Sequence, residues 1–178
     1  MPRVKKDNTN KPCFSLRLFA LLNGMLTART TIISAPAGYG KTTAARYFLD
    51  QHLPEGAAVY HLDCLEEPVG AAWKRFGSII QKIDTGIGNT LLKIGLPDED
   101  TKGDAACLLT ELVCAEETWL VIDDFQLFQT VVPETVWNAL IEYGAENLHT
   151  VILTQRPVKI RMTLKPGVLY IGREDMRL

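Results

Sequence analysis

The sequence predicts an α/β fold in which helices cover both faces of a mostly parallel sheet. Short apolar, β-branched runs alternate along the chain with segments whose apolar residues recur at helical spacing. The runs are apolar along their whole length rather than at every second residue, which is typical of strands buried on both faces. With 178 residues, the chain is long enough to form one domain around a single core.

The strands are expected to alternate with helices after one N-terminal helix. The apolar runs predict strands over 30–34, 57–63, 118–124 and 150–154, and a shorter run makes 168–171 a candidate fifth strand. Helical spacing predicts helices over 16–26, 41–52, 69–83, 105–115 and 133–143. Asp104 is the expected N-cap of the fourth of these. The glycine-rich stretches 85–90 and 95–104 are expected to be connectors around a short helical piece.

Composition and charge exclude several classes of function. The formal net charge of −2 and the 47% apolar content are those of an ordinary globular protein, and nothing in them attracts nucleic acid or an anionic membrane. Residues 16–26 follow a basic head but are interrupted by Arg17, Asn23 and Gly24, so they predict an amphipathic helix rather than an export signal. No run approaches the roughly 20 apolar residues that span a bilayer. We therefore expect a cytoplasmic protein, with 1–14 as a flexible segment.

The stretch SAPAGYGKTT, residues 34–43, joins the first predicted strand to the following helix. Glycines let a backbone curl closely around an anion, and a helix N-terminus presents free N–H groups and a partial positive charge. This pattern predicts a phosphate-binding loop in which Lys41 reaches the β- and γ-phosphates, Thr42 ligates Mg²⁺ and Thr43 contacts the α-phosphate. The expected nucleotide-binding residues are Pro36, Ala37, Gly38, Tyr39, Gly40, Lys41, Thr42 and Thr43.

One position departs from the strict pattern G-x-x-x-x-G-K-[ST]. Ala35 stands where the first glycine is expected, whereas the second glycine, the lysine and the threonine are all in place. The stiff ring of Pro36 would shape the loop in place of a flexible glycine.

An acidic pair ends the third predicted strand. In WLVIDD, Asp123 and Asp124 follow four apolar residues. Hydrated Mg²⁺ prefers few protein carboxylates, so we expect Asp123 to hold the metal through water. Asp124 is the candidate catalytic residue that orients or deprotonates an attacking water.

Two further polar residues follow strands whose ends should meet at the same edge. The fourth strand is followed by Thr154, Gln155 and Arg156, and we expect Arg156 to sense the terminal phosphate and to act in catalysis. Asp63 ends the second strand, where a role in the site and a role as a helix or turn cap are both open.

These stretches resemble one family. SAPAGYGKTT, HLD with the aromatic helix AAWKRF, WLVIDDFQLF and VILTQR are together similar to the nucleotide-binding domain of MalT-like regulators, which are large LuxR-type transcriptional activators of the signal-transduction ATPase (STAND) class. The similarity covers roughly residues 15 to 175. Alanine at the first loop position is the variant of that family.

The resemblance implies a three-layer P-loop NTPase fold with a five-stranded sheet in the order 5-1-4-3-2. It implies ATP and ADP with Mg²⁺ as ligands, and a switch from an ADP-bound resting form to an ATP-bound oligomer. Residues 15–178 would then be a fragment of a longer regulator, whose DNA and inducer are bound by modules outside this chain. Asp124 stands where the family has a glutamate, one methylene longer, so we expect slow ATP hydrolysis at most.

Other functions remain open on the sequence alone. A small-molecule kinase on the same core is the main alternative, although such enzymes use lid arginines and residues 85–155 contain none. A GTPase would use an Asn-Lys-x-Asp guanine reader, which the sequence lacks. A fragment that only mediates interactions is the third alternative.

Overall fold

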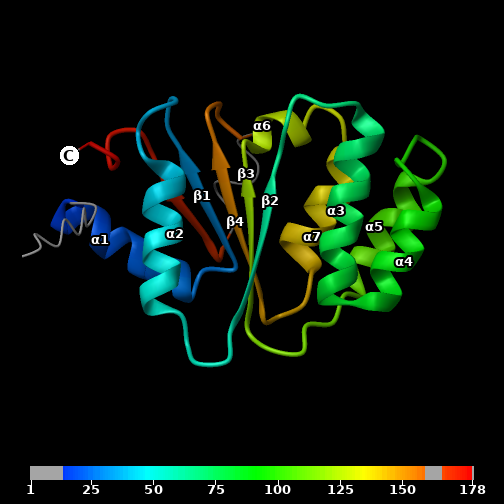
Figure 1. The fold of residues 1–178 in the computed structure, drawn as a ribbon, viewed down its shortest axis with the longest axis horizontal. Coiled ribbons are helices and arrows are strands. Elements are labelled where there is room, and N and C mark those ends of the chain that lie inside the picture. Colours follow the sequence, from blue (N-terminus) through cyan, green and yellow to red (C-terminus); the bar gives the residue numbers. More distant parts are fainter. Residues whose placement is uncertain (1–13, 159–165, 178) are drawn as a thin grey trace, which may run out of the picture.

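The computed structural model describes residues 14–158 and 166–177. Figure 1 shows one sheet lying between two layers of helices. The strands are β1 (Thr30–Ser34), β2 (Ala58–Asp63), β3 (Thr118–Asp123), β4 (Leu148–Thr154) and β5 (Val168–Ile171). The helices are α1 (Leu16–Asn23), α2 (Lys41–His52), α3 (Val69–Ile83), α4 (Thr85–Ile94), α5 (Lys102–Thr110), α6 (Phe125–Phe128) and α7 (Glu134–Tyr143), with a 3₁₀ turn η1 (Gly24–Leu26) after α1.

The strand order confirms the predicted topology. The five strands are all parallel and lie in the order β2-β3-β4-β1-β5, which is the expected 5-1-4-3-2 order counted from the other edge. β4 therefore lies between β1, which leads into the glycine-rich loop, and β3, which ends in the aspartates. The carboxyl ends of these three strands meet at one edge of the sheet, where ligands of open α/β sheets bind.

A hydrophobic core covers each face of the sheet because successive residues of a strand point to opposite faces. On β3, Trp119 and Val121 pack into the core that includes α1 and α2. Leu120 and Ile122 pack into the core that includes α3, α5 and α7. All four side chains are at most 1% exposed. This two-sided burial explains why the strand is apolar along its length.

Three helical details differ from the prediction. Residues 85–90, expected as a connector, begin α4, because the Asp84 carboxylate caps the helix by accepting from the Ile87 N–H at 3.1 Å. α5 spans Lys102–Thr110 rather than 105–115, which places Asp104 inside its first turn instead of at its N-cap. The short helix α6 was not predicted, because four residues are too few to show a helical period.

The expected N-terminal segment lies almost wholly outside the described residues. Its last residue, Phe14, is described, and its ring packs 5.6 Å from the ring of Tyr47 on α2, measured between centroids. Ser15 follows as the N-cap of α1, accepting from the Leu18 N–H at 3.1 Å. Among the described residues, Phe14 is thus already packed against the domain.

Candidate nucleotide-binding site

The loop between β1 and α2 has the backbone form that anion binding requires. Gly38 and Gly40 have φ values of +82° and +74°, in the left-handed region that favours glycine. Gly40 is the N-cap of α2, so the first N–H groups of this helix are directed toward the loop. Most loop residues are exposed to solvent, Tyr39 is half-buried, and Thr43 lies exposed on the first turn of α2. The loop can therefore receive a ligand without unfolding.

Ala35 occupies a place that does not need glycine. It is only 3% exposed and packs into the core that includes α2, and its N–H donates to the carbonyl oxygen of Thr154 at 3.2 Å. Among the described residues, Asp124 is the one non-glycine residue with positive φ, so Ala35 lies in an ordinary backbone region. A methyl group is tolerated here because the loop begins its turn one or more residues later.

Lys41 is folded back onto the loop from the start of α2. Its ammonium Nζ donates to the carbonyl oxygens of Ala35 at 2.8 Å and Pro36 at 3.1 Å, and the residue is 7% exposed. Burial lowers the pKa of Lys41 below its usual 10.5, while the charges of Asp123 and Asp124 act in the opposite direction. The ammonium thus lies beside the loop and donates to two neutral carbonyl oxygens. The negatively charged oxygens of a phosphate would accept stronger hydrogen bonds from it.

Thr42 and Asp123 are in direct contact. The Thr42 hydroxyl donates to Oδ2 of Asp123 at 2.6 Å, which joins the first turn of α2 to the end of β3. Both groups are partly buried and present oxygen atoms that can act as metal ligands, the ligand type that Mg²⁺ prefers. The structure therefore brings Asp123 into contact with Thr42, which lies 81 residues earlier in the sequence and directly after Lys41.

Asp124 has a different environment from Asp123. Its backbone is left-handed, with φ +52°, and its N–H donates to Oδ1 of Asp123 at 2.9 Å. Its own Oδ1 accepts from two side-chain amides, those of Gln126 and Gln155, each at 2.9 Å. The Asp124 carboxylate is thus oriented by two amide donors at the end of β3.

The two glutamines link the ends of β3 and β4. The side-chain oxygen Oε1 of Gln126 accepts from the Thr154 hydroxyl at 3.1 Å and from the Gln155 backbone N–H at 3.0 Å. Sequence reasoning placed Gln155 at this edge but gave it no role, and it missed Gln126. The available signal was the polar Gln126 between apolar residues in DFQLF. Its role becomes clear only from the position of α6 in the structure.

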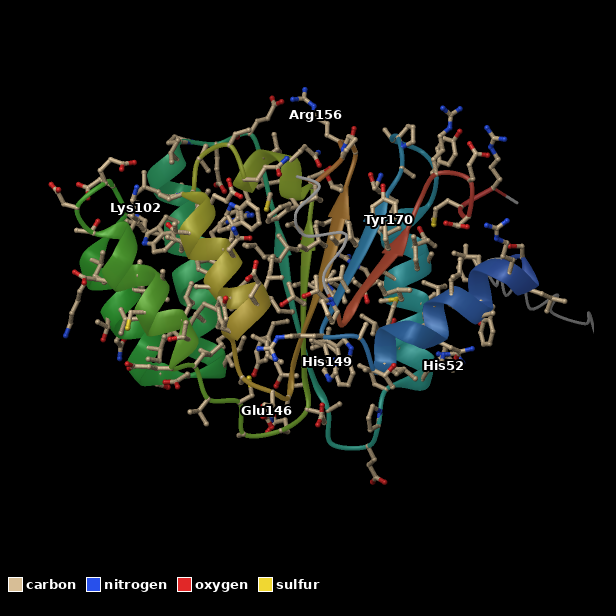
Figure 2. The ribbon with its side chains drawn as sticks, turned by 180° about the vertical axis from the view of Figure 1, so that it is seen from behind. His52, Lys102, Glu146, His149, Arg156 and Tyr170 are labelled. Carbon is tan, nitrogen blue, oxygen red and sulfur yellow. The ribbon has the colours of Figure 1, made fainter. Side chains whose placement is uncertain are left out.

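Arg156 lies just beyond β4, and Asp63, at the end of β2, is the register partner of Asp123 on β3. Figure 2 shows Arg156 at the tip of β4 with its side chain directed outward. Arg156 lines an open hollow of about 540 Å³ together with Asp124, Gln126 and Gln155, so it lies at the same edge of the sheet as the predicted site. Asp63 pairs with Arg46 of α2 at 2.9 Å, and both side chains are largely exposed.

A thiol also lines the hollow beside Asp124. Burial raises the pKa of Cys64 to about 12, so the thiol stays protonated at neutral pH. A protonated, buried thiol is a poor nucleophile, and the chemistry at this edge therefore depends on oxygen and amide groups.

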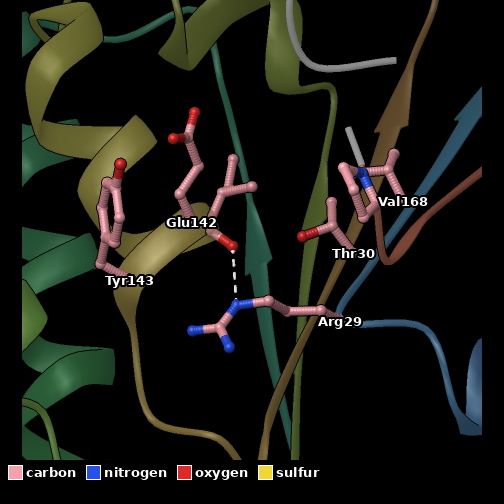
Figure 3. Close-up of a pocket in the computed structure, with 7 residues that line it drawn as sticks. Arg29, Thr30, Glu142, Tyr143 and Val168 are labelled. Carbon is pink, nitrogen blue, oxygen red and sulfur yellow. Dashed lines mark hydrogen bonds between the residues drawn. The ribbon is translucent and has the colours of Figure 1, made fainter. Parts of the chain in front are cut away.

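A smaller cavity of about 180 Å³ lies at the opposite edge of the sheet (Figure 3). It is lined by residues at the starts of β1 and β5 and the end of α7, and Arg29 crosses it to donate from Nε to the Ile141 carbonyl at 3.2 Å. Arg29 also donates to the Gly144 carbonyl, so it satisfies carbonyl groups at the end of α7. This cavity is remote from the glycine-rich loop.

The fold and the loop define a P-loop NTPase. A family model described as an AAA domain matches residues 25–164, and the chain belongs to that family. No curated protein matches the chain in sequence. Among solved structures, the chain is similar to the structure of C. elegans PCH-2, with 11% identity and a TM-score of 0.40. That match covers 87% of this chain and 39% of that chain.

The described part of the chain holds no helix that is both long and apolar enough to cross a bilayer. The chain is thus an AAA-type P-loop nucleotide-binding domain, with its loop, lysine and acidic pair at one edge of a parallel sheet.

Proposed function

We propose that the chain is an ATP/ADP-binding switch domain with slow Mg²⁺-dependent ATP hydrolysis at most. The observation that carries this proposal is the contact between the Thr42 hydroxyl and Asp123 at 2.6 Å beside the buried ammonium of Lys41. A cation, free helix N–H groups and paired oxygen donors suit a nucleotide phosphate chain and its metal ion.

The donor set fits Mg²⁺. The Thr42 hydroxyl and the Asp123 carboxylate would hold the ion, directly or through water. The bound ion would neutralise charge on the phosphate oxygens. The residues of the chain then divide the remaining work: the N–H groups of residues 38–43 orient the phosphates, and Lys41 adds a point charge.

Slow hydrolysis is supported by the environment of Asp124. Its Oδ1 is held by the amides of Gln126 and Gln155, and its side chain is one methylene shorter than a glutamate. P-loop enzymes catalyse hydrolysis mostly by positioning the reactants and stabilising charge. In slow nucleotide switches, a partner protein often supplies the cation that accelerates hydrolysis. Arg156, exposed at the tip of β4, is our candidate for sensing the terminal phosphate.

The finer assignment is also a proposal. The likeness of SAPAGYGKTT, WLVIDDFQLF and VILTQR to MalT-like, LuxR-type regulators supports a role in transcription regulation. In that role, nucleotide exchange would control ATP-dependent self-association of a longer protein, while DNA and inducer would be bound by other modules. A cytoplasmic location would follow from this role.

Calorimetric titration with Mg·ADP and Mg·ATP tests the function. We expect the wild-type chain to bind both, and Lys41→Ala to lose most of the affinity, because the ammonium is the main cation of the loop. Lys102→Ala, a change remote from the loop in Figure 2, is the matched control and should bind as the wild type does. Wild-type protein that ignores both nucleotides at millimolar concentration would refute the proposal.

Two further measurements separate the alternatives. Competition between ATP and GTP should favour ATP, and a preference for GTP would contradict the assignment. Incubation with ATP and candidate acceptors, followed by product analysis, should give no phosphorylated metabolite. Transfer to an acceptor would instead establish the phosphotransferase alternative.

A further inference from the structure

A second cationic side chain lies against the loop, and it comes from the far end of the chain. Nε of Arg173 donates to the hydroxyl of Tyr39 at 3.1 Å. The carbon at the centre of the guanidinium group lies 5.7 Å from the centre of the Tyr39 ring. The two residues are 134 positions apart in sequence, and Tyr39 is the loop residue directly before Gly40.

The backbone that carries Arg173 is firmly placed. In the turn after β5, Asp175 accepts from the Gly172 N–H at 2.9 Å and from the guanidinium of Arg17 on α1 at 2.6 Å. Met176 is 4% exposed and belongs to the core that includes α1 and α2. The turn is thus fixed to the rest of the domain, while the side chain of Arg173 itself is exposed to solvent.

The strand order decides from which side Arg173 approaches the loop. β5 pairs with β1 on one side and β4 pairs with it on the other, with β3 beyond β4. Asp123 and the proposed metal site therefore lie on the β4 side of the loop, and Arg173 lies on the β5 side. A phosphate chain held in the loop would have a cation on each side.

The chemistry of the guanidinium leaves it able to bind an anion. Nε is the nitrogen that contacts Tyr39, and a guanidinium carries four more N–H bonds on its terminal nitrogens. These form charge-assisted bonds with phosphate oxygens, which are stronger than a bond to a neutral hydroxyl. An incoming phosphate can therefore be bound while the side chain remains beside Tyr39.

We propose that Arg173 is a nucleotide-binding residue that donates to phosphate oxygens of a nucleotide in the loop from the β5 side. This inference rests on the proposed function and adds a ligand contact from the segment after β5. The ligand class is a nucleoside diphosphate or triphosphate. The turn of residues 172–176 would then be part of the site rather than a surface connection.

The test is ADP affinity measured in the presence of Mg²⁺ on the full chain. Arg173→Ala should weaken ADP binding about tenfold, the usual effect of losing one charge-assisted hydrogen bond. Arg177→Ala is the matched control, because Arg177 is an exposed arginine four residues further along the chain and pairs with Glu174 at 2.8 Å. It should leave the affinity unchanged. Arg173→Lys keeps the charge and should recover part of the loss.

Two readouts separate binding from a structural role. Arg173→Ala should reduce the salt dependence of ADP affinity, since one fewer cation contacts the ligand, and Arg177→Ala should not. The midpoint of thermal unfolding without nucleotide should be the same in both variants. An Arg173→Ala protein that binds ADP like the wild type would overturn the inference while the function stands. Loss of affinity with a lowered midpoint and an unchanged salt dependence would also overturn it.

The proposed function fails separately. If wild-type protein and Lys41→Ala are equally unable to bind ADP, the function itself is refuted, and the role of Arg173 is refuted with it. If the wild type binds, Lys41→Ala does not and Arg173→Ala matches Arg177→Ala, only the inference is lost.

Discussion

Lys41 is a cation folded back onto carbonyl oxygens of the loop. Its ammonium is held by the carbonyls of Ala35 and Pro36, at 2.8 and 3.1 Å, in a place that is nearly closed to solvent. Burial without a paired carboxylate disfavours the charged form, which is why the pKa falls despite Asp123 and Asp124 nearby. A bound phosphate would supply the missing negative charge.

The lowered pKa of Lys41 gives a pH prediction with a definite sign. As pH rises through that pKa, which lies below 10.5, the ammonium becomes neutral and ADP affinity should fall. The nucleotide-free fold should change in the opposite sense, because the unfolded chain binds more protons in this window and stability therefore rises with pH. Titrations of ADP at several alkaline pH values measure the first effect. A wild-type affinity that stays constant until an ordinary lysine titrates would contradict this prediction.

At the scale of elements, the strands and long helices were predictable because each carries its own period. β1 and α2 have the predicted bounds, and β4 begins two residues before its predicted start. Only the end of α4 was expected to be helical, because the glycines in its first part favour a loop when they are considered alone. The helix forms because Asp84 caps it and because it packs closely against α3 through Gly88.

The contact between α3 and α4 yields a stability prediction. A methyl group at position 88 would lie 2.2 Å from Cα of Gln81. Relieving this clash requires a shift of the backbone, which costs more free energy than a rotation of a flexible side chain. Gly88→Ala should therefore destabilise the domain by about 1–3 kcal/mol through overpacking. Gly86→Ala is the control on the same helix, because its nearest neighbour would be 3.5 Å away. It should be neutral or stabilising by about 1 kcal/mol. Urea unfolding measures both, and equal stability of the two variants would refute the close contact.

At the scale of the whole molecule, the strand order assembles the site. The sequence identified Lys41, Thr42 and Asp123 because each has a local motif, and the parallel topology brings their strands' ends to one edge. The glutamine link between β3 and β4 and the approach of Arg173 to Tyr39 could not be predicted. Both contacts depend on the positions of α6 and of the turn after β5 in the fold. These positions cannot be inferred from residue spacing in the sequence.

The most direct test of the central claim is a crystal structure of the chain with Mg·ADP. The account predicts that the diphosphate contacts the main-chain N–H groups of residues 38–43, with the metal ion beside the Thr42 hydroxyl and Asp123 and the Lys41 ammonium turned from the loop carbonyls to phosphate. Nucleotide bound elsewhere, or a saturated crystal whose loop keeps the Lys41 contacts to Ala35 and Pro36 unchanged, would contradict it.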